Sequence, residues 1–138
     1  MKNLIEIKKK ITDNWFISLQ NKIIKQFQLL ENTASKENRS KAKQFLKREW
    51  KKDNKKEGGG TSYLLNGGAL FDKVGINQST VSGQFAKAYR SKILGAEKNG
   101  KYWASGISVV AHMKNPKIPA FHFNTRFIVT SKEWFGGG

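Results

Sequence analysis

The chain has 138 residues, and 26 Lys and Arg against 10 Asp and Glu give it a formal net charge of +16. It contains no cysteine, which excludes disulfide frameworks, thiolate nucleophiles, cysteine-ligated zinc and iron–sulfur clusters. The length suits one domain with its own core, and no apolar run approaches the roughly 20 residues of a membrane span. The amino terminus lacks the apolar segment of an export signal, so we expect a cytoplasmic protein.

Residues 1–57 are predicted to form a helical segment, because all 13 glycines and both prolines lie at or beyond Gly58. Apolar residues recur every three or four positions and predict one long amphipathic helix over residues 1–32: Leu4, Ile7, Ile11, Trp15, Leu19, Ile23, Phe27 and Leu30. A polar loop is expected at residues 32–40. A second, shorter helix is expected around residues 42–50, with Trp15 and Trp50 in the core. The charged residues 51–57 then form a mobile surface segment.

Residues 58–138 are predicted to form an antiparallel sheet, since the apolar period shifts from about 3.6 towards 2. Residues 61–65 and 69–74 flank Asn66-Gly67-Gly68, a hairpin signal because Asn and Gly tolerate positive φ. Residues 81–85 suggest a short strand, and residues 86–100 an irregular segment. The clearest strands are 102–113 and 120–130, an antiparallel pair around a proline-containing turn. The fold class is therefore α+β, in a single domain.

Polar side chains that can bind and protonate a substrate are expected on one face of this strand pair. Alternation places His122, Asn124 and Arg126 on one face, and Ser108 shares a face with His112. We expect His112 opposite His122, which puts Val110 opposite Asn124 and Ser108 opposite Arg126.

A guanidinium binds carboxylates, amide and hydroxyl groups add hydrogen bonds, and imidazole exchanges protons near neutral pH. This face therefore suits a carboxylate-bearing substrate, although an ordinary solvated polar face has the same pattern. The two histidines are alternatively metal ligands, but no carboxylate stands at a matching position to complete such a site.

Several motifs follow one another with characteristic spacing: Glu49-Trp50, Asn66-Gly-Gly-Ala-Leu-Phe71, Val74-Gly-Ile-Asn77, Gly106-Ile-Ser-Val-Val-Ala-His112, Asn115-Pro116, His122-Phe-Asn-Thr-Arg-Phe127 and Trp134-Phe-Gly-Gly-Gly138. With these motifs, residues 45–138 resemble the oxygen-dependent coproporphyrinogen oxidase family. The resemblance implies oxidative decarboxylation of two propionates of coproporphyrinogen III to give protoporphyrinogen IX in haem synthesis. It further implies molecular oxygen as co-substrate, no organic cofactor, and a homodimer built on a large antiparallel sheet flanked by helices. A divalent metal has been proposed for some members.

By motif position, the resemblance assigns each polar residue of the face a role. His122 corresponds to the catalytic acid/base, and His112 with His122 to a metal site. Substrate contacts correspond to Ser108, Asn124, Thr125 and Arg126.

The resemblance covers roughly the amino-terminal half of such an enzyme, so we expect this chain to lack the family's dimerisation region. Residues 78–83 also lack a histidine common in the family. We therefore expect a truncated chain with an incomplete fold and little or no turnover on its own. One alternative is the complementing half of a split enzyme, whose partner is a separate carboxy-terminal polypeptide. The other is a basic nucleic-acid-binding module, which ranks last because the sequence has no recognition-helix or base-stacking motif.

Overall fold

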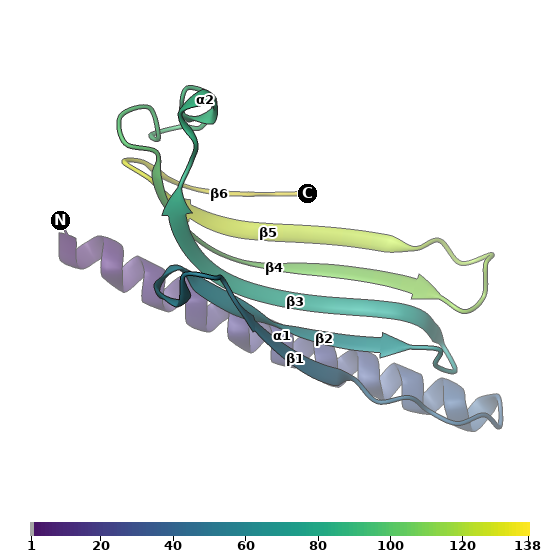
Figure 1. The fold of residues 1–138 in the computed structure, drawn as a ribbon. Helices are drawn as coiled ribbons and strands as arrows, with labels where there is room; N and C mark the ends of the chain where they lie inside the picture. The colour runs from purple at the N-terminus through teal and green to yellow at the C-terminus, as the bar shows by residue number, and fades with distance from the viewer. Residues whose placement is uncertain (1) are drawn as a thin grey trace.

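A six-stranded antiparallel sheet with one long helix against one face makes up residues 2–138, the part of the chain that the computed structural model describes (Figure 1). The strands cross the sheet in chain order, each hydrogen-bonded to the next. The elements are α1 (Lys2–Glu37), β1 (Leu46–Lys51), the 3-10 turn η1 (Lys55–Glu57), β2 (Gly58–Asn66), β3 (Phe71–Gln84), α2 (Lys87–Arg90), β4 (Lys101–Met113), β5 (Phe121–Val129) and β6 (Glu133–Gly137). The α+β class with an antiparallel sheet is confirmed.

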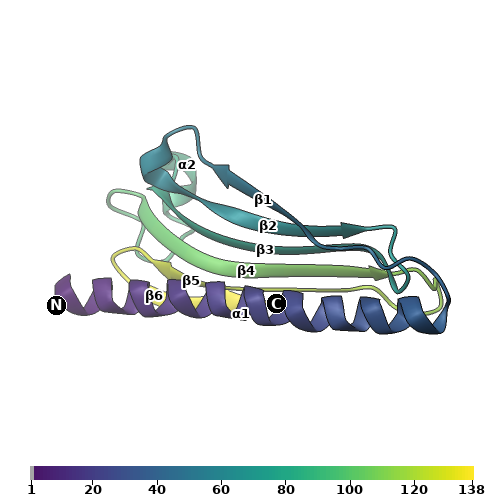
Figure 2. The same cartoon turned by 90° about the horizontal axis from the view of Figure 1, so that it is seen from below.

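The core lies between α1 and the sheet, where the helix packs on β3 and β4 (Figure 2). Phe16 of α1 is 1% exposed and packs among apolar residues of four strands: Leu65, Phe71, Val74, Ile76, Ile107, Val109, Ala111, Phe127 and Val129. Leu19, Ile23 and Phe27, three residues of the predicted apolar stripe, pack against this cluster. Within residues 2–138, no helix combines the length and apolar character needed to cross a membrane.

The amino-terminal part of the predicted stripe faces solvent, so the prediction of Trp15 as a core residue was wrong. Trp15 is 55% exposed, and further members of the stripe are exposed as well: Leu4, Ile7, Ile11 and Leu30. The helix instead turns Thr12, Phe16 and Gln20 towards the sheet. The Gln20 side chain donates hydrogen bonds to two backbone carbonyl oxygens, at 2.8 and 3.0 Å, which compensates its burial.

Glu31 joins the last part of α1 to the hairpin between β2 and β3. Its fully buried carboxylate accepts hydrogen bonds from four backbone N–H groups, those of Lys43, Ala69, Leu70 and Phe71. Burial alone raises the pKa of Glu31, but the four donors together outweigh burial and lower it from 4.5. The helix continues to Glu37, so the loop predicted at residues 32–40 begins later than expected.

Residues 46–51 form strand β1, and the prediction of a second helix there was wrong. β1 pairs with β2, with Arg48 opposite Ser62 and Trp50 opposite Gly60. Every residue of β1 is exposed, and Trp50, predicted to lie in the core, is 43% exposed. A few apolar residues at helical spacing cannot distinguish a helix from a short strand, and pairing with β2 decides the outcome.

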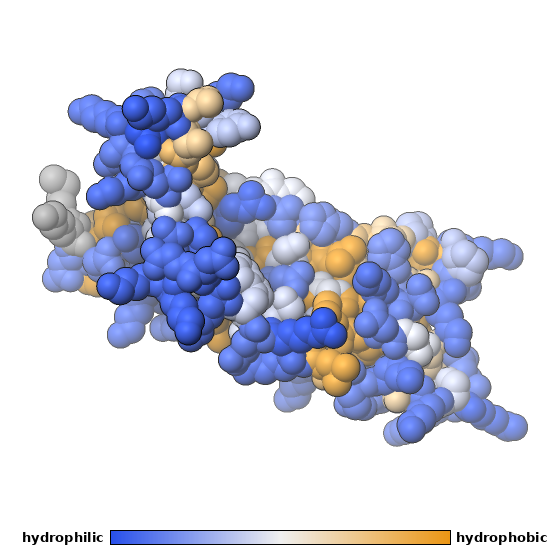
Figure 3. Space-filling model, in the orientation of Figure 1, coloured by the Kyte–Doolittle hydropathy of each residue, from blue (hydrophilic) through white to orange (hydrophobic). Residues whose placement is uncertain are grey.

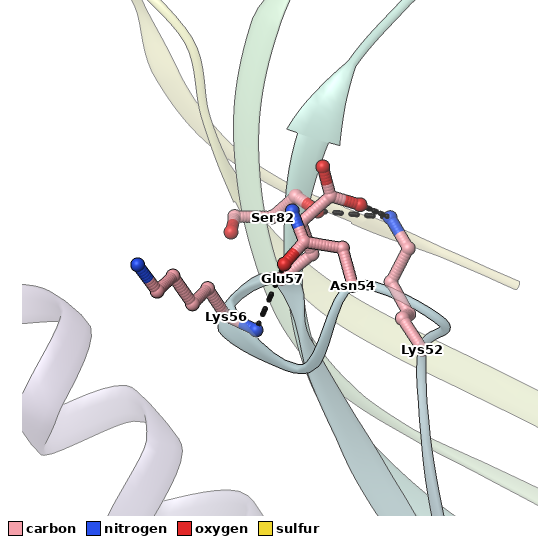
Figure 4. Close-up of polar contacts among 5 residues, drawn as sticks. All are labelled: Lys52, Asn54, Lys56, Glu57 and Ser82. Carbon is pink, nitrogen blue, oxygen red and sulfur yellow. Dashed lines mark hydrogen bonds and ion pairs between the residues drawn. The ribbon is translucent and has the colours of Figure 1, made fainter.

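Polar contacts order the charged segment after β1, which lies at the surface as expected (Figure 4). The Lys52 ammonium lies 2.7 Å from a Glu57 carboxylate oxygen and donates to the Ser82 carbonyl oxygen at 3.0 Å. The hydrogen bond to Glu57 raises the pKa of Lys52 above its ordinary value. The Asn54 side chain accepts from the Lys56 N–H at 3.2 Å and caps η1. The segment is therefore a hydrogen-bonded turn.

The hairpin at Asn66-Gly67-Gly68 is confirmed. Gly67 has a φ of +61°, the left-handed conformation that favours glycine, and its N–H donates to the Asp72 carbonyl oxygen at 2.7 Å. β3 runs on to Gln84, so the short strand expected at residues 81–85 is largely the end of β3. Residues 86–100 contain the single-turn helix α2 and turns, in agreement with an irregular segment.

The two strands that carry the expected site pair antiparallel, as predicted, but in a different register. Ser108 lies opposite Asn124 and Val110 opposite His122, whereas His112 was expected opposite His122. The pairing is displaced by two residues. The last pair is Ala111 opposite Phe121, and β4 continues to Met113 beyond it, paired with β3 only. A two-residue displacement keeps every side chain on its predicted face.

Candidate active site on the open face of the sheet

The candidate site lies on the open face, which we define as the face of the sheet turned away from α1. In β4, residues 105, 107, 109 and 111 are buried against the helix, so the even-numbered residues lie on the open face. The pairings extend this face across the sheet to the following residues: Arg48, Trp50, Ser62, Asn77, Ser79, Ser108, His122, Asn124 and Arg126. At the end that bears η1 and α2, the strands curl away from α1, so the open face is concave (Figure 2).

Three neighbouring strands bring amide and hydroxyl side chains into one row on the open face. Asn77 of β3 pairs with Ser108 of β4, and Ser108 pairs with Asn124 of β5. Arg126 lies one step along β5, on the same face, and its guanidinium Nη2 donates to the Asn124 Oδ1 at 2.6 Å. This contact holds the guanidinium beside the amide and leaves its remaining N–H groups for an anion.

His122 joins the same group through Ser108. The Nε2 atom of His122 lies 3.2 Å from the Ser108 hydroxyl oxygen. Which of the two atoms donates depends on the tautomer of the imidazole. The proton on His122 and the orientation of the Ser108 hydroxyl are therefore coupled. His122 is exposed at the surface. The structure thus brings together Ser108, His122, Asn124 and Arg126, four of the six residues predicted for the site.

A shallow pocket of about 210 Å³ lies over β3, β4 and β5 at this group. Ser108, Asn124, Thr125 and Arg126 all border it. Thr125 alternates with the residues of the open face, so its backbone borders the pocket while its side chain belongs to the helix-facing side. His112 is outside the pocket and pairs with Lys73 of β3.

Further residues that border the pocket were missed from the sequence, among them Asn77, Ser79 and Ser105. Ser105 is 1% exposed, and its hydroxyl donates to the Asp13 carboxylate of α1 at 3.1 Å. The same carboxylate accepts from Thr80 and Gln78. A polar layer thus supports the pocket floor from below, between sheet and helix. Polar residues at alternate positions of β3 were the available signal for Asn77 and Ser79.

Gly106 makes room for the arginine of the site. It pairs with Arg126 across β4 and β5, and a Cβ atom at Gly106 would lie 2.7 Å from the Arg126 Cβ. Any side chain at position 106 would therefore displace β5 or the arginine. The glycine is explained by this close approach rather than by an unusual backbone conformation.

The predicted two-histidine metal site is incomplete among the described residues. Within residues 2–138, no group of three or more His, Cys, Asp or Glu side chains is placed to hold a metal ion. His112 and His122 share the open face but are not paired across the strands. Because a protein metal site ordinarily uses three or four such ligands, these two residues alone do not fit one.

Chemically, the site can bind a carboxylate and hold a proton beside it. The guanidinium of Arg126 and the amide of Asn124 supply anion-binding donors, and His122 with Ser108 supplies the proton-exchanging pair. The chain as a whole carries a formal net charge of +16, which favours a substrate with several negative charges. In Figure 3, which shows this face, pale and hydrophobic surface lies among hydrophilic residues, as a large, partly apolar anion would require.

The sequence of this chain is similar to those of known proteins. Residues 11–138 match the family model described as coproporphyrinogen III oxidase. The chain is 50% identical over 131 residues to the oxygen-dependent coproporphyrinogen-III oxidases of Rickettsia typhi and Rickettsia prowazekii. It is 46% identical over 130 residues to the enzyme of the same name from Rickettsia bellii. Each match covers 94% of this chain and 46% of the relative, so the chain spans about half the length of the curated relatives it matches.

Proposed function

The chain belongs to the coproporphyrinogen III oxidase family, and we propose that its open face binds coproporphyrinogen III for oxygen-dependent oxidative decarboxylation. In this reaction each of two propionates becomes a vinyl group, and the product is protoporphyrinogen IX. Each propionate loses carbon dioxide and a hydride equivalent from its β-carbon, and molecular oxygen takes up that hydride together with a proton from solution to give hydrogen peroxide. The family match over residues 11–138 and the carboxylate-binding chemistry of the pocket support this proposal.

Arg126 binds a propionate carboxylate in the proposed complex. Its guanidinium is pre-oriented by the 2.6 Å hydrogen bond to Asn124, whose side-chain N–H groups remain available for a second contact. The Ser108 hydroxyl, on the neighbouring strand β4 and the same face, adds a neutral hydrogen bond. Thr125 contributes through its backbone at the pocket border.

His122 exchanges the proton that accompanies the reaction at the bound propionate. The contact with Ser108 orients its Nε2 atom towards the pocket residues. No step is assigned to a metal ion, because His112 and His122 do not make up a ligand set. A reaction without an organic cofactor stays a prediction from the family resemblance, as does a cytoplasmic location.

Partner chains supply the remaining walls of the substrate site in this proposal. The described residues form one wall, a shallow pocket on an open sheet, so we expect little turnover from the chain on its own. On the family resemblance we propose a complementing carboxy-terminal polypeptide as this partner, and homodimerisation is proposed for the whole enzyme only. The outer edge of β6, which pairs only with β5 within residues 2–138, offers free backbone groups for such a polypeptide.

The observation that carries the proposal is the convergence of Ser108, Asn124 and Arg126 on one pocket. A fluorescence titration with coproporphyrin III, the stable oxidised form of the macrocycle, tests it. Hydrogen bonds to a charged group contribute about 1.5–3 kcal/mol, so Arg126→Gln should weaken binding by roughly tenfold to a hundredfold. Arg39→Gln, at an exposed arginine beyond the end of α1, removes the same charge away from the pocket and is the control. Equal affinities of the two variants would contradict the assignment.

A further inference from the structure

Strand β1 places a cationic side chain, Arg48, and an exposed indole, Trp50, on the open face. They share this face with the candidate active site but lie at the β1 edge of the sheet. Arg48 pairs with Ser62 of β2, in the same cross-strand row as Asn77, Ser108 and Asn124. Trp50 belongs to the adjacent row, which includes Arg126 on β5 and ends at Gly136 on β6. The two residues are exposed, and the candidate active site described above does not include them.

The charge of Arg48 is not neutralised by its neighbours. None of the four ion pairs within residues 2–138 includes Arg48. The adjacent acidic residue, Glu49, alternates to the other face and pairs with Lys47 at 2.7 Å. The hydrogen bond from Lys47 also lowers the pKa of Glu49. Arg48 therefore offers a free guanidinium to an anion on the open face.

The indole of Trp50 leans from the edge strand towards the middle of the sheet. A Cβ atom at Gly60 would lie 3.0 Å from the Trp50 Nε1, so the ring edge lies directly beside the Gly60 backbone. Trp50 borders a groove of about 270 Å³ with residues 58–61 of β2. An exposed indole beside a groove presents a flat apolar surface and one N–H donor.

No long side chain separates Trp50 from Arg126 along their row. The intervening positions are Gly60, Ser79 and Gly106 on β2, β3 and β4. Neighbouring strands lie about 4.8 Å apart, so β1 and β5 are roughly 19 Å apart across four intervals. Both arginine side chains are long enough to lean inward, so the two guanidinium groups can reach the opposite sides of a tetrapyrrole lying over this row.

We propose that Arg48 and Trp50 form a second substrate subsite, in which Arg48 binds a propionate remote from the one at Arg126 and Trp50 contacts the macrocycle. The inference rests on the proposed function, because it takes coproporphyrinogen III as the ligand. It extends the candidate site from three central strands to the β1 edge of the sheet. A tetracarboxylate is then held at two separated anchors, whereas a dicarboxylate with adjacent propionates engages one anchor at a time.

Two porphyrins and three matched arginine variants of the full 138-residue chain test the subsite. Coproporphyrin III has four propionates, and deuteroporphyrin IX has two adjacent ones. Arg48→Gln should weaken coproporphyrin III binding by about tenfold, since it removes a charge-assisted contact. Deuteroporphyrin IX affinity should change by less than about twofold, because Arg126 still binds it. Arg39→Gln controls for loss of net charge and should leave both affinities within about twofold of the unmodified chain.

A second measurement reports on Trp50 without changing it. In hydroxyl-radical footprinting, coproporphyrin III should protect Trp50 from oxidation and leave Trp15, exposed on α1, unprotected. If Arg48→Gln matches Arg39→Gln while Arg126→Gln still weakens binding, the second subsite is refuted and the proposed function stands. Equal oxidation of Trp50 with and without ligand refutes the indole contact. If the unmodified chain binds neither porphyrin, both proposals fail.

Discussion

Replacing Glu31 by Gln should strongly destabilise the fold, although the two side chains have nearly the same shape. Each carboxylate oxygen of Glu31 accepts two backbone N–H groups: Oε1 accepts from Lys43 and Ala69, and Oε2 from Leu70 and Phe71. A Gln amide has one oxygen and one NH₂ group. Whichever way it is turned, the NH₂ group faces two N–H donors and cannot accept from them.

The expected loss follows from those two unpartnered donors. A buried hydrogen-bonding group left unsatisfied costs about 1–3 kcal/mol, and Glu31 is fully buried, so Glu31→Gln should lower the free energy of unfolding by about 2–5 kcal/mol. For a domain of ordinary stability, about 5–15 kcal/mol, this is a large fraction.

Urea unfolding followed by circular dichroism at pH 7 measures the difference between the variant and the unmodified chain. Glu37→Gln, at the exposed end of α1, is the control and should change the free energy of unfolding by less than about 0.5 kcal/mol. A loss below about 1 kcal/mol for Glu31→Gln would show that the four N–H groups find other partners. The Glu31 carboxylate would then not be required for the stability of the fold.

Acid should weaken the fold through the same carboxylate, because the pKa of Glu31 is lowered from 4.5 in the folded chain. The contribution of Glu31 to the free energy of unfolding is therefore complete above the unfolded-state pKa and is lost as pH falls through the folded-state pKa. Urea midpoints measured between pH 7 and pH 3 should fall more steeply for the unmodified chain than for Glu31→Gln, and parallel curves would exclude Glu31 as the cause. Gly68→Ala should also destabilise, because the new Cβ would lie 2.7 Å from the Glu31 Cδ, and a thermal melt should show it. Gly67→Ala meets no neighbouring atom and adds only the strain of a positive φ, about 1 kcal/mol, so equal melting temperatures for the two alanine variants would contradict the packing argument.

The spacing of apolar residues along the chain predicted the strands better than it predicted the buried face of α1. The hairpin at Gly67, β4, β5 and their antiparallel pairing followed from alternation and from turn residues. The buried face of α1 did not follow from hydrophobicity, because Gln20 and Glu31 are buried, and all their partners except Lys43 lie 38 to 56 residues away in the sequence. Those partners exist only once the sheet has formed, and local periodicity contains no information about them.

Strand β1 was missed for a related reason. Its fate depends on pairing with the glycine-rich β2, where Gly59 and Gly60 let the backbone of β1 and the Trp50 ring approach closely. Spacing within residues 42–50 alone suggested a helix. The error also hid Arg48, since a residue assigned to a helix could not be placed on a sheet face.

The members of the candidate site were predictable, but their pairing was not. Side-chain alternation put Ser108, His122, Asn124 and Arg126 on one face, and the structure keeps them there. The opposing pairs were displaced by two residues: the last pair is Ala111 opposite Phe121, and the end of β4 at Met113 pairs with β3 only. Side chains alternate between the two faces with a period of two residues, so a two-residue displacement leaves every residue on its face. The residues that make up a face are therefore easier to predict than the contacts between them.

The chain-order arrangement of the strands has a consequence for folding. Every strand pairs with its immediate successor, so the sheet can grow one hairpin at a time and its pairings close short loops. α1 is the exception: it is synthesised first, yet its packing surface on β3 and β4 is complete only when residue 113 has emerged from the ribosome. Until then the part of α1 that packs on β4 has no partner, and apolar surface exposed in this way favours aggregation of the incomplete chain.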